Sequence, residues 1–302
     1  MIRRTVAAAT ALMLAAPAHA ALTEAPRLAA IYDSILAAQF DRAAALIPES
    51  CPPAPNEACR ALAGAALWWQ ILVDPESRRL DKRLIETVHA AVEASTAWTR
   101  REPDDAEAWF YLGGSYAPLV QLRVLRGDRI AAARDANKIR AALERALQLD
   151  PDLDDAYFGI GMYHYYADVA PAYAKVLRWL LLLPGGDRTK GLREIVQARD
   201  HAQLLAGEAD FQIQQIYLWY EHRPRDALAL LESLDERYPS NPVFLERIAE
   251  VHDTYFHDLD ASADAWQALL DRAENERVYR ARMMAARARQ QLRALAARRV
   301  LK

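Results

Sequence analysis

Histidine and carboxylate side chains are the residues of this chain that could hold a metal ion. His252, Asp253 and His257 lie close together in the sequence. On a helix the two histidines would be about 140° apart, whereas a helical zinc motif places its histidines four residues apart on one face. His164 and Asp168 have that spacing, but a zinc site takes three or four protein ligands. We therefore expect no metal and no other cofactor.

A glycine-rich segment is the one place where the sequence could cradle a phosphate. It runs from Gly185 to Gly191 and reads GGDRTKG. The segment lacks the Gly-x4-Gly-Lys-Ser/Thr order of a phosphate loop, and no strand leads into it. A turn followed by a helix that Asp187 caps is the better interpretation.

Paired carboxylates could act as a general acid and base. Asp104-Asp105 and Asp154-Asp155 each stand just before an expected helix, where negative charge meets the positive end of the helix dipole. The chain has no Gly-x-Ser-x-Gly nucleophile motif. We therefore expect no enzymatic activity. The alternative is a helical enzyme that acts on cell-wall glycans with two carboxylates.

The two cysteines, Cys51 and Cys59, flank a proline-rich segment that cannot be helical. A close, even pair of cysteines predicts a disulfide that ties the first helical hairpin together if the chain is exported, and its first 20 residues indicate export, as described next. The alternative is a metal or redox pair. It is less favoured because no histidine lies between or beside the cysteines and the spacing is not Cys-x-x-Cys.

The first 20 residues have the features of a cleavable signal peptide. Arg3 and Arg4 give a positive start, and an apolar run from Val6 to Ala16 is too short to span a bilayer. Ala18-His19-Ala20 then supplies the small residues that signal peptidase requires. We predict cleavage after Ala20 and a periplasmic or secreted protein.

Charge and hydropathy narrow the possible partners. The chain of 302 residues carries 38 basic and 41 acidic residues, and removal of Arg3 and Arg4 makes the net charge −5. This balance argues against nucleic-acid binding.

The leucine-rich segment 176–183 is expected to be buried, with a contact patch as the alternative. A peripheral membrane-associated assembly factor, which contacts anionic lipid weakly through a basic C-terminal helix, is a further alternative.

The helices are expected to form one repeated domain over residues 21–302. The chain has only 10 glycines and no strand-like runs, so the expected fold class is all-α. Trp109, Leu112, Gly113 and Tyr116 place large, apolar, small and aromatic residues at offsets 0, 3, 4 and 7. Related patterns return with a period of about 34 residues, as in stacked helical hairpins. The expected units are 106–151, 154–207, 208–241 and 242–275, followed by a capping helix over 276–302.

The first of these units is longer than a standard repeat, because about 14 residues are added around positions 118–136 relative to a 34-residue repeat. The added part contains Arg123, Arg126, Arg129 and Arg134. We expect these arginines to form a solvated face, with a ligand-contacting patch as the alternative.

The motif Trp-x2-Leu-Gly-x2-Tyr, followed by Ala-Leu-x-Leu-x-Pro up to Pro151, resembles the tetratricopeptide repeat. Gly159-Ile160-Gly161, Tyr165-Tyr166 and Gly186-Asp187-Arg188 also resemble the inclusion-body-clearance family of these proteins and its exported bacterial relatives. The resemblance implies a right-handed α-solenoid whose first helices line a concave groove. It implies no enzymatic activity.

The resemblance also assigns residues to that groove, which would bind a protein or a peptide. A mixed aromatic and acidic lining suits an extended peptide with some basic side chains, because aromatic residues anchor such contacts. The groove residues implied by the repeat positions are Phe110, Asp155, Phe158, Met162, Tyr165, Gln212, Ile216, Trp219, Glu246, Glu250 and Asp253.

Overall fold

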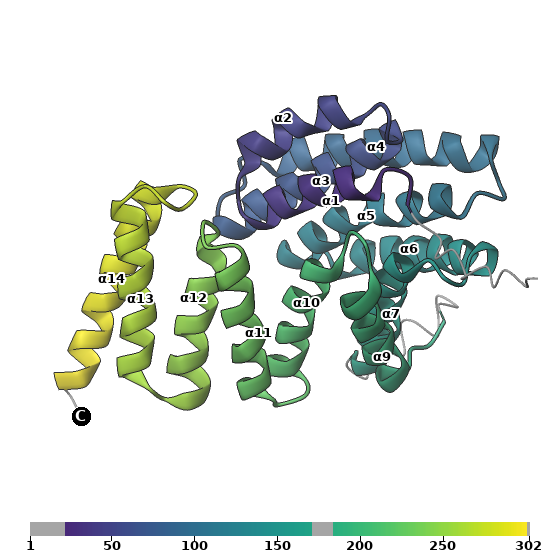
Figure 1. The fold of residues 1–302 in the computed structure, drawn as a ribbon. Coiled ribbons are helices and arrows are strands. Elements are labelled where there is room, and N and C mark those ends of the chain that lie inside the picture. The colour runs from purple at the N-terminus through teal and green to yellow at the C-terminus, as the bar shows by residue number, and fades with distance from the viewer. Residues whose placement is uncertain (1–21, 171–183, 301–302) are drawn as a thin grey trace, which may run out of the picture.

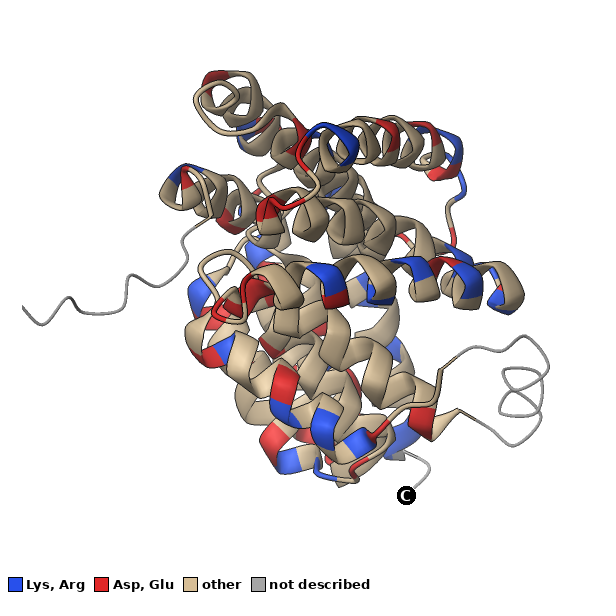
Figure 2. Ribbon diagram, turned by 90° about the vertical axis from the view of Figure 1, so that its right-hand side faces the viewer, with Lys and Arg blue, Asp and Glu red and all other residues tan. Residues whose placement is uncertain are grey.

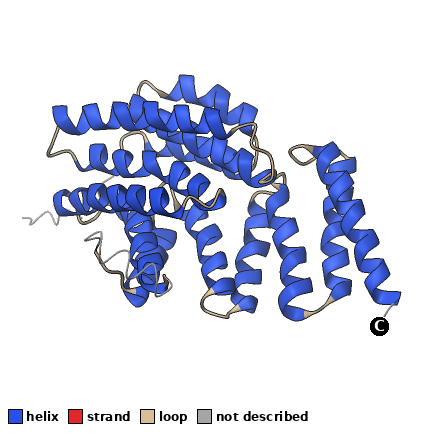
Figure 3. Ribbon diagram, turned by 180° about the vertical axis from the view of Figure 1, so that it is seen from behind, coloured by secondary structure: helices blue, strands red, loops and turns tan. Residues whose placement is uncertain are grey.

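The computed structural model describes residues 22–170 and 184–300, so the predictions for the signal peptide and for segment 176–183 lie outside the described residues. Within these ranges all regular structure is helical (Figure 3), which confirms the all-α class there. The 13 α-helices and one π-helix are α1 (Ala25–Leu36), α2 (Phe40–Ser50), α3 (Asn56–Val73), α4 (Asp81–Arg101), α5 (Ala106–Leu125), α6 (Arg129–Leu149), α7 (Asp154–Val169), α9 (Arg188–His201), α10 (Ala206–Trp219), α11 (Pro224–Arg237), α12 (Pro242–Val251), η1 (His252–Phe256), α13 (Leu259–Glu274) and α14 (Ala281–Val300).

Successive helices pack against one another as a row of antiparallel pairs (Figure 1). Glycines permit the closest approaches. A Cβ on Gly113 would lie 2.9 Å from the Leu143 side chain, and one on Gly191 would lie 2.6 Å from the carbonyl oxygen of Gly161. Gly113 therefore leaves room for the Leu143 side chain between α5 and α6, and Gly191 lets α9 meet α7 almost backbone to backbone.

Short polar side chains begin several of the helices. Asp187 accepts a hydrogen bond from the backbone N–H of Lys190 at 2.8 Å, which confirms the predicted cap of α9. Such a bond satisfies one of the N–H groups that the first helical turn leaves unpaired. The same kind of cap is made by Asp105, Asp128, Asn241 and Asp258.

The added residues 118–136 lengthen both helices of the α5–α6 hairpin. Their arginines do not all form a solvated face. The Arg126 guanidinium donates to both carboxylate oxygens of Asp81 at 2.8 Å and to the carbonyl oxygens of Pro75 and Ser77. Arg123 pairs with the buried Asp135. These two arginines therefore hold neighbouring elements together.

Elsewhere, acidic and basic residues are interspersed along the helices (Figure 2). Pairs one turn apart on the same helix, such as Arg140 and Glu144, account for part of this pattern.

The N-terminal helices pack against the later part of the chain. The Trp69 ring of α3 lies 4.8 Å from that of Phe211 in α10 and 6.0 Å from that of Phe244 in α12, between ring centroids. The Asn241 side chain donates to the carbonyl oxygen of Leu36 at 2.7 Å. The helices α1 and α3 therefore contact helices that are distant in the sequence, unlike the units of a solenoid, which touch only their neighbours.

A disulfide joins Cys51, just after α2, to Cys59 in α3, with an S–S distance of 2.10 Å. It links the end of one helix to the early part of the next across the proline-rich connection. Among the described residues, no helix combines the length and apolar character needed to cross a membrane.

Candidate partner-binding site

Five of the residues assigned to the groove are buried: Phe110, Asp155, Tyr165, Gln212 and Ile216. They offer no surface to a partner in this structure. Phe158 and Met162 are half-buried, whereas Trp219 is 51% exposed near the end of α10. The described structure does not gather these residues into one open groove.

Asp155 has a structural role near the start of α10. Its carboxylate accepts hydrogen bonds from the backbone N–H groups of Gln203, Leu204 and Leu205 at 2.8–2.9 Å. Burial raises the pKa of this carboxyl, and the three backbone N–H groups oppose that shift. Asp155 therefore organises the connection between α9 and α10.

Tyr165 belongs to a network at the start of α9. Its hydroxyl donates to Glu221 at 2.6 Å, and the same carboxylate accepts two hydrogen bonds from Arg188. Burial and the Glu221 carboxylate raise the pKa of Tyr165. Asp168 accepts from the backbone N–H of Arg188 at 3.0 Å, beside the cap at Asp187. The backbone N–H groups of Arg188 and Lys190 in the glycine-rich segment thus donate to carboxylates of the chain itself, which agrees with the interpretation of this segment as a turn and a helix cap.

The inner face of α10 is covered by α1 and α3. Glu208 is buried there and accepts hydrogen bonds from the Tyr32 hydroxyl and the Trp69 indole, both at 3.0 Å. Gln212 donates to the other carboxylate oxygen at 2.9 Å. Burial raises the pKa of Glu208, although these donors favour its charged form. The N-terminal helices thus occupy the surface that the tetratricopeptide resemblance assigns to a ligand.

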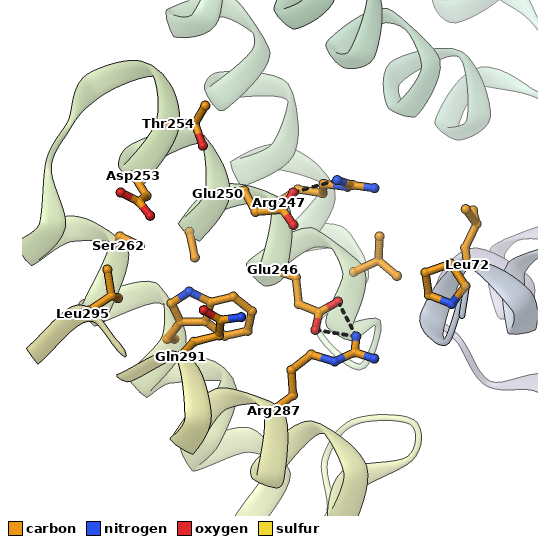
Figure 4. A pocket seen from close by; sticks show the side chains of 14 residues that line it. Leu72, Glu246, Arg247, Glu250, Asp253, Thr254, Ser262, Arg287, Gln291 and Leu295 are labelled. Atoms are coloured by element: carbon orange, nitrogen blue, oxygen red, sulfur yellow. Dashed lines mark hydrogen bonds and ion pairs between the residues drawn. The ribbon is translucent and has the colours of Figure 1, made fainter. Parts of the chain in front are cut away.

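The last three predicted residues, Glu246, Glu250 and Asp253, do come together. They are spaced four and three residues apart, and so form one acidic stripe along α12 and η1. This acidic stripe lines an open pocket of about 220 Å³ between α12, α13, α14 and the end of α3 (Figure 4). Leu72 and Pro75 form its wall on the side of α3.

Arginines neutralise the acidic stripe. Arg287 of α14 pairs with Glu246 at 2.8 Å, and both side chains are largely buried. Arg298 of α14 holds Asp253 through two bonds of 2.6 Å, and Arg247 pairs with Glu250 at 2.6 Å. The Glu250 side chain is 53% exposed. The outer part of the stripe is therefore reachable from solvent, while the inner pair is fixed.

Burial also raises the pKa of Glu246, and the charge of Arg287 partly opposes that shift. Breaking this ion pair would leave a poorly solvated charge. Glu246 and Arg287 therefore shape the pocket and are poor candidates for exchange with a ligand.

The floor of the pocket comes from residues that sequence reasoning did not assign. Trp266 and Ser262 of α13 are buried against it, and Gln291 of α14 faces it (Figure 4). The Ser262 hydroxyl has no hydrogen-bond partner among the described residues. The sequence predicted a cap for the last helix, with a weak contact to anionic lipid as the alternative, and neither interpretation indicated that α14 would complete this pocket.

The described residues contain no group of three His, Cys, Asp or Glu side chains that could hold a metal ion. His164 contacts Glu194 instead, with its Nδ1 2.6 Å from the carboxylate.

Comparisons with known proteins identify no relative: no protein-family model matches the chain, and no curated protein matches it significantly.

Proposed function

We propose that the protein is an exported interaction scaffold of the tetratricopeptide type, a right-handed α-solenoid that binds a protein or peptide partner and catalyses no reaction. Two features support this proposal. The helices pack pairwise in chain order, and glycines stand where neighbouring helices approach most closely. The segment 1–20, with its signal-peptide features, supports action in the periplasm or outside the cell.

The observation that carries the proposal is the convergence of Glu246, Glu250 and Asp253 on one pocket. The tetratricopeptide resemblance assigns these positions to the partner, and they lie where the N-terminal helices leave a surface open. An open pocket with aliphatic walls, one exposed carboxylate and a second that is partly exposed suits a peptide segment that carries a basic side chain.

The exposed ion pairs suggest how such a side chain would enter. Pairs on the surface contribute about 0–1 kcal/mol to stability. The side chains of Arg298 and Asp253 are 52% and 28% exposed, and those of Arg247 and Glu250 are 37% and 53% exposed. A lysine or arginine of the partner would replace Arg298 or Arg247 beside these carboxylates at little cost. The buried pair of Glu246 and Arg287 would stay in place.

The test is capture of partners from the exported protein fraction with three forms of the purified protein. The wild type should retain a specific protein, and the double variant Glu250→Gln with Asp253→Asn should lose most of it. The matched control, Glu232→Gln with Glu236→Gln, removes two exposed carboxylates of α11 and should bind as the wild type does. Equal retention by all three forms would contradict the proposed site.

A further inference from the structure

A second surface of the molecule combines exposed apolar side chains with an excess of positive charge. Among the described residues, the large apolar side chains that are exposed are Val124, Leu125, Ile130 and Trp219. Val124 and Leu125 end α5, and Ile130 begins α6, so three of them lie at the same turn. We refer to residues 124–130 as the apolar turn. Apolar groups gathered on a surface in this way mark a contact site.

Arg126 fixes the apolar turn to the connection between α3 and α4. Its hydrogen bonds to Ser77 and Asp81 flank Arg78 and Arg79, which are therefore held beside the turn. Lys82 and Arg83 follow in the first turn of α4. All four side chains are exposed, and we call them the basic strip. The apolar turn and the basic strip lie at the same end of the antiparallel helices α3 to α6.

Two exposed carboxylates, Glu76 and Glu86, flank the basic strip in the sequence and balance part of its charge. Lys82 lies 3.8 Å from Glu86, and both side chains are largely exposed. Asp81 forms its ion pair with Arg126, and Asp128 accepts a hydrogen bond at the start of α6. Within the described ranges, no ion pair joins Arg78, Arg79 or Arg83 to a carboxylate. Arg134, one helical turn from Ile130, adds another exposed cation without such a pair.

The C-terminal basic helix differs from the basic strip in this respect. Four arginines of α14, Arg287, Arg289, Arg298 and Arg299, each pair with a carboxylate of α12, η1 or α13. Much of the positive charge that the sequence placed on this helix is thus neutralised within the molecule. The apolar turn, with the basic strip beside it, is the better candidate for an anionic partner.

We propose that the apolar turn and the basic strip form a docking site for an anionic phospholipid membrane. Unpaired arginines attract a densely anionic surface, and the apolar side chains of the turn would enter the boundary between headgroups and acyl chains. This surface shares no residue with the acidic stripe, although Pro75, to which Arg126 donates, lines the same pocket as the stripe. The membrane proposal does not depend on the proposed partner-binding function. An acidic protein segment is the competing occupant, and it would show itself by failure of the vesicle test.

The experiment is co-sedimentation of the purified full chain with vesicles of phosphatidylcholine containing 40% phosphatidylglycerol at low salt, compared with vesicles of phosphatidylcholine alone. The wild type should bind the anionic vesicles only. Arg78→Ser with Arg79→Ser should reduce binding more than tenfold, because each charge near the surface contributes about fivefold. Val124→Ser with Ile130→Ser should also weaken it. The matched control, Arg282→Ser with Arg293→Ser on α14, should change it little.

A second measurement reports insertion and does not depend on affinity alone. Ile130→Cys carrying an environment-sensitive dye should show a blue-shifted emission with anionic vesicles, whereas the dye on Ala286→Cys of α14 should not. Unchanged circular dichroism establishes that each variant folds. The proposal is overturned if the wild type does not bind anionic vesicles, if both double arginine variants lose binding equally, or if the dye on residue 130 stays in water.

Discussion

The indole N–H of Trp69 donates to the buried carboxylate of Glu208 at 3.0 Å, across 139 positions of sequence. The Tyr32 hydroxyl donates to the same carboxylate oxygen. This contact joins α1 and α3 to α10 and covers the inner face of the later helices. Because that face is occupied, we propose that a partner uses the pocket beside α14 instead.

Replacing Glu208 should show how much this contact stabilises the fold. Glu208→Ala leaves the buried donors of Tyr32, Trp69 and Gln212 without an acceptor, and each such group costs about 1–3 kcal/mol. We expect the free energy of unfolding to fall by about 3 kcal/mol or more in urea denaturation. Glu208→Gln keeps an acceptor and should cost much less. An equal loss for both variants would mean that the network is not held by hydrogen bonds.

The stability of the wild type should depend on pH through the same residue. Burial raises the pKa of Glu208 above its ordinary value of 4.5, so the folded state holds its proton to higher pH than the unfolded chain does. The contribution of Glu208 to the free energy of unfolding therefore falls as pH rises from about 4.5 through the raised pKa. Urea denaturation across this range should show a shallower decline for Glu208→Gln. Identical slopes would contradict the assignment.

Two glycine substitutions should have opposite effects on stability, because one glycine lies in the close contact of α7 and α9 and the other faces open space on α5. A Cβ on Gly191 would lie 2.5 Å from the backbone nitrogen of Tyr165, whereas one on Gly114 of α5 meets nothing within 4 Å. Gly191→Ala should destabilise by about 1–3 kcal/mol through overpacking. Gly114→Ala should stabilise by up to about 1 kcal/mol through helix propensity. Thermal unfolding followed by circular dichroism measures both changes.

The disulfide should stabilise the N-terminal helices by restricting the unfolded chain. Cys51 and Cys59 are separated by 8 positions, and a loop of this size is worth roughly 2–3 kcal/mol in the chain-entropy model. Cys51→Ser with Cys59→Ser should lower the urea midpoint accordingly. A reducing agent should lower the midpoint of the wild type to a similar degree and leave the double variant unchanged. Failure of the reducing agent to affect the wild type would contradict a structural bridge.

Local features of the fold could be predicted from sequence because they depend on neighbouring residues. Asp187 was recognised as a cap, and Gly113 as the small residue of a helix contact. The cysteine pair was predicted from its spacing. Each of these rests on residues within one turn, one connection or one repeat.

The return of α1 and α3 onto α10 could not be predicted in the same way. In the sequence, Trp69 looks like any other apolar residue of a helix. Glu208 stands in the first turn of another helix, where a solvated carboxylate is common. Their pairing leaves no trace in the periodicity of either segment. The same holds for Glu246 and Arg287, which meet only because α13 brings α14 alongside α12. The repeat positions therefore identified the acidic side of the pocket and missed its basic side.

Site-directed photo-cross-linking in the exporting cell tests the proposed function most directly. A benzoylphenylalanine at position 291, replacing a glutamine that is exposed and faces the pocket, should give a specific cross-linked product with the partner. The same probe at position 232, on the exposed face of α11, should give none. A product from position 232 alone, or none from position 291, would show that the pocket beside α14 is not where a partner binds.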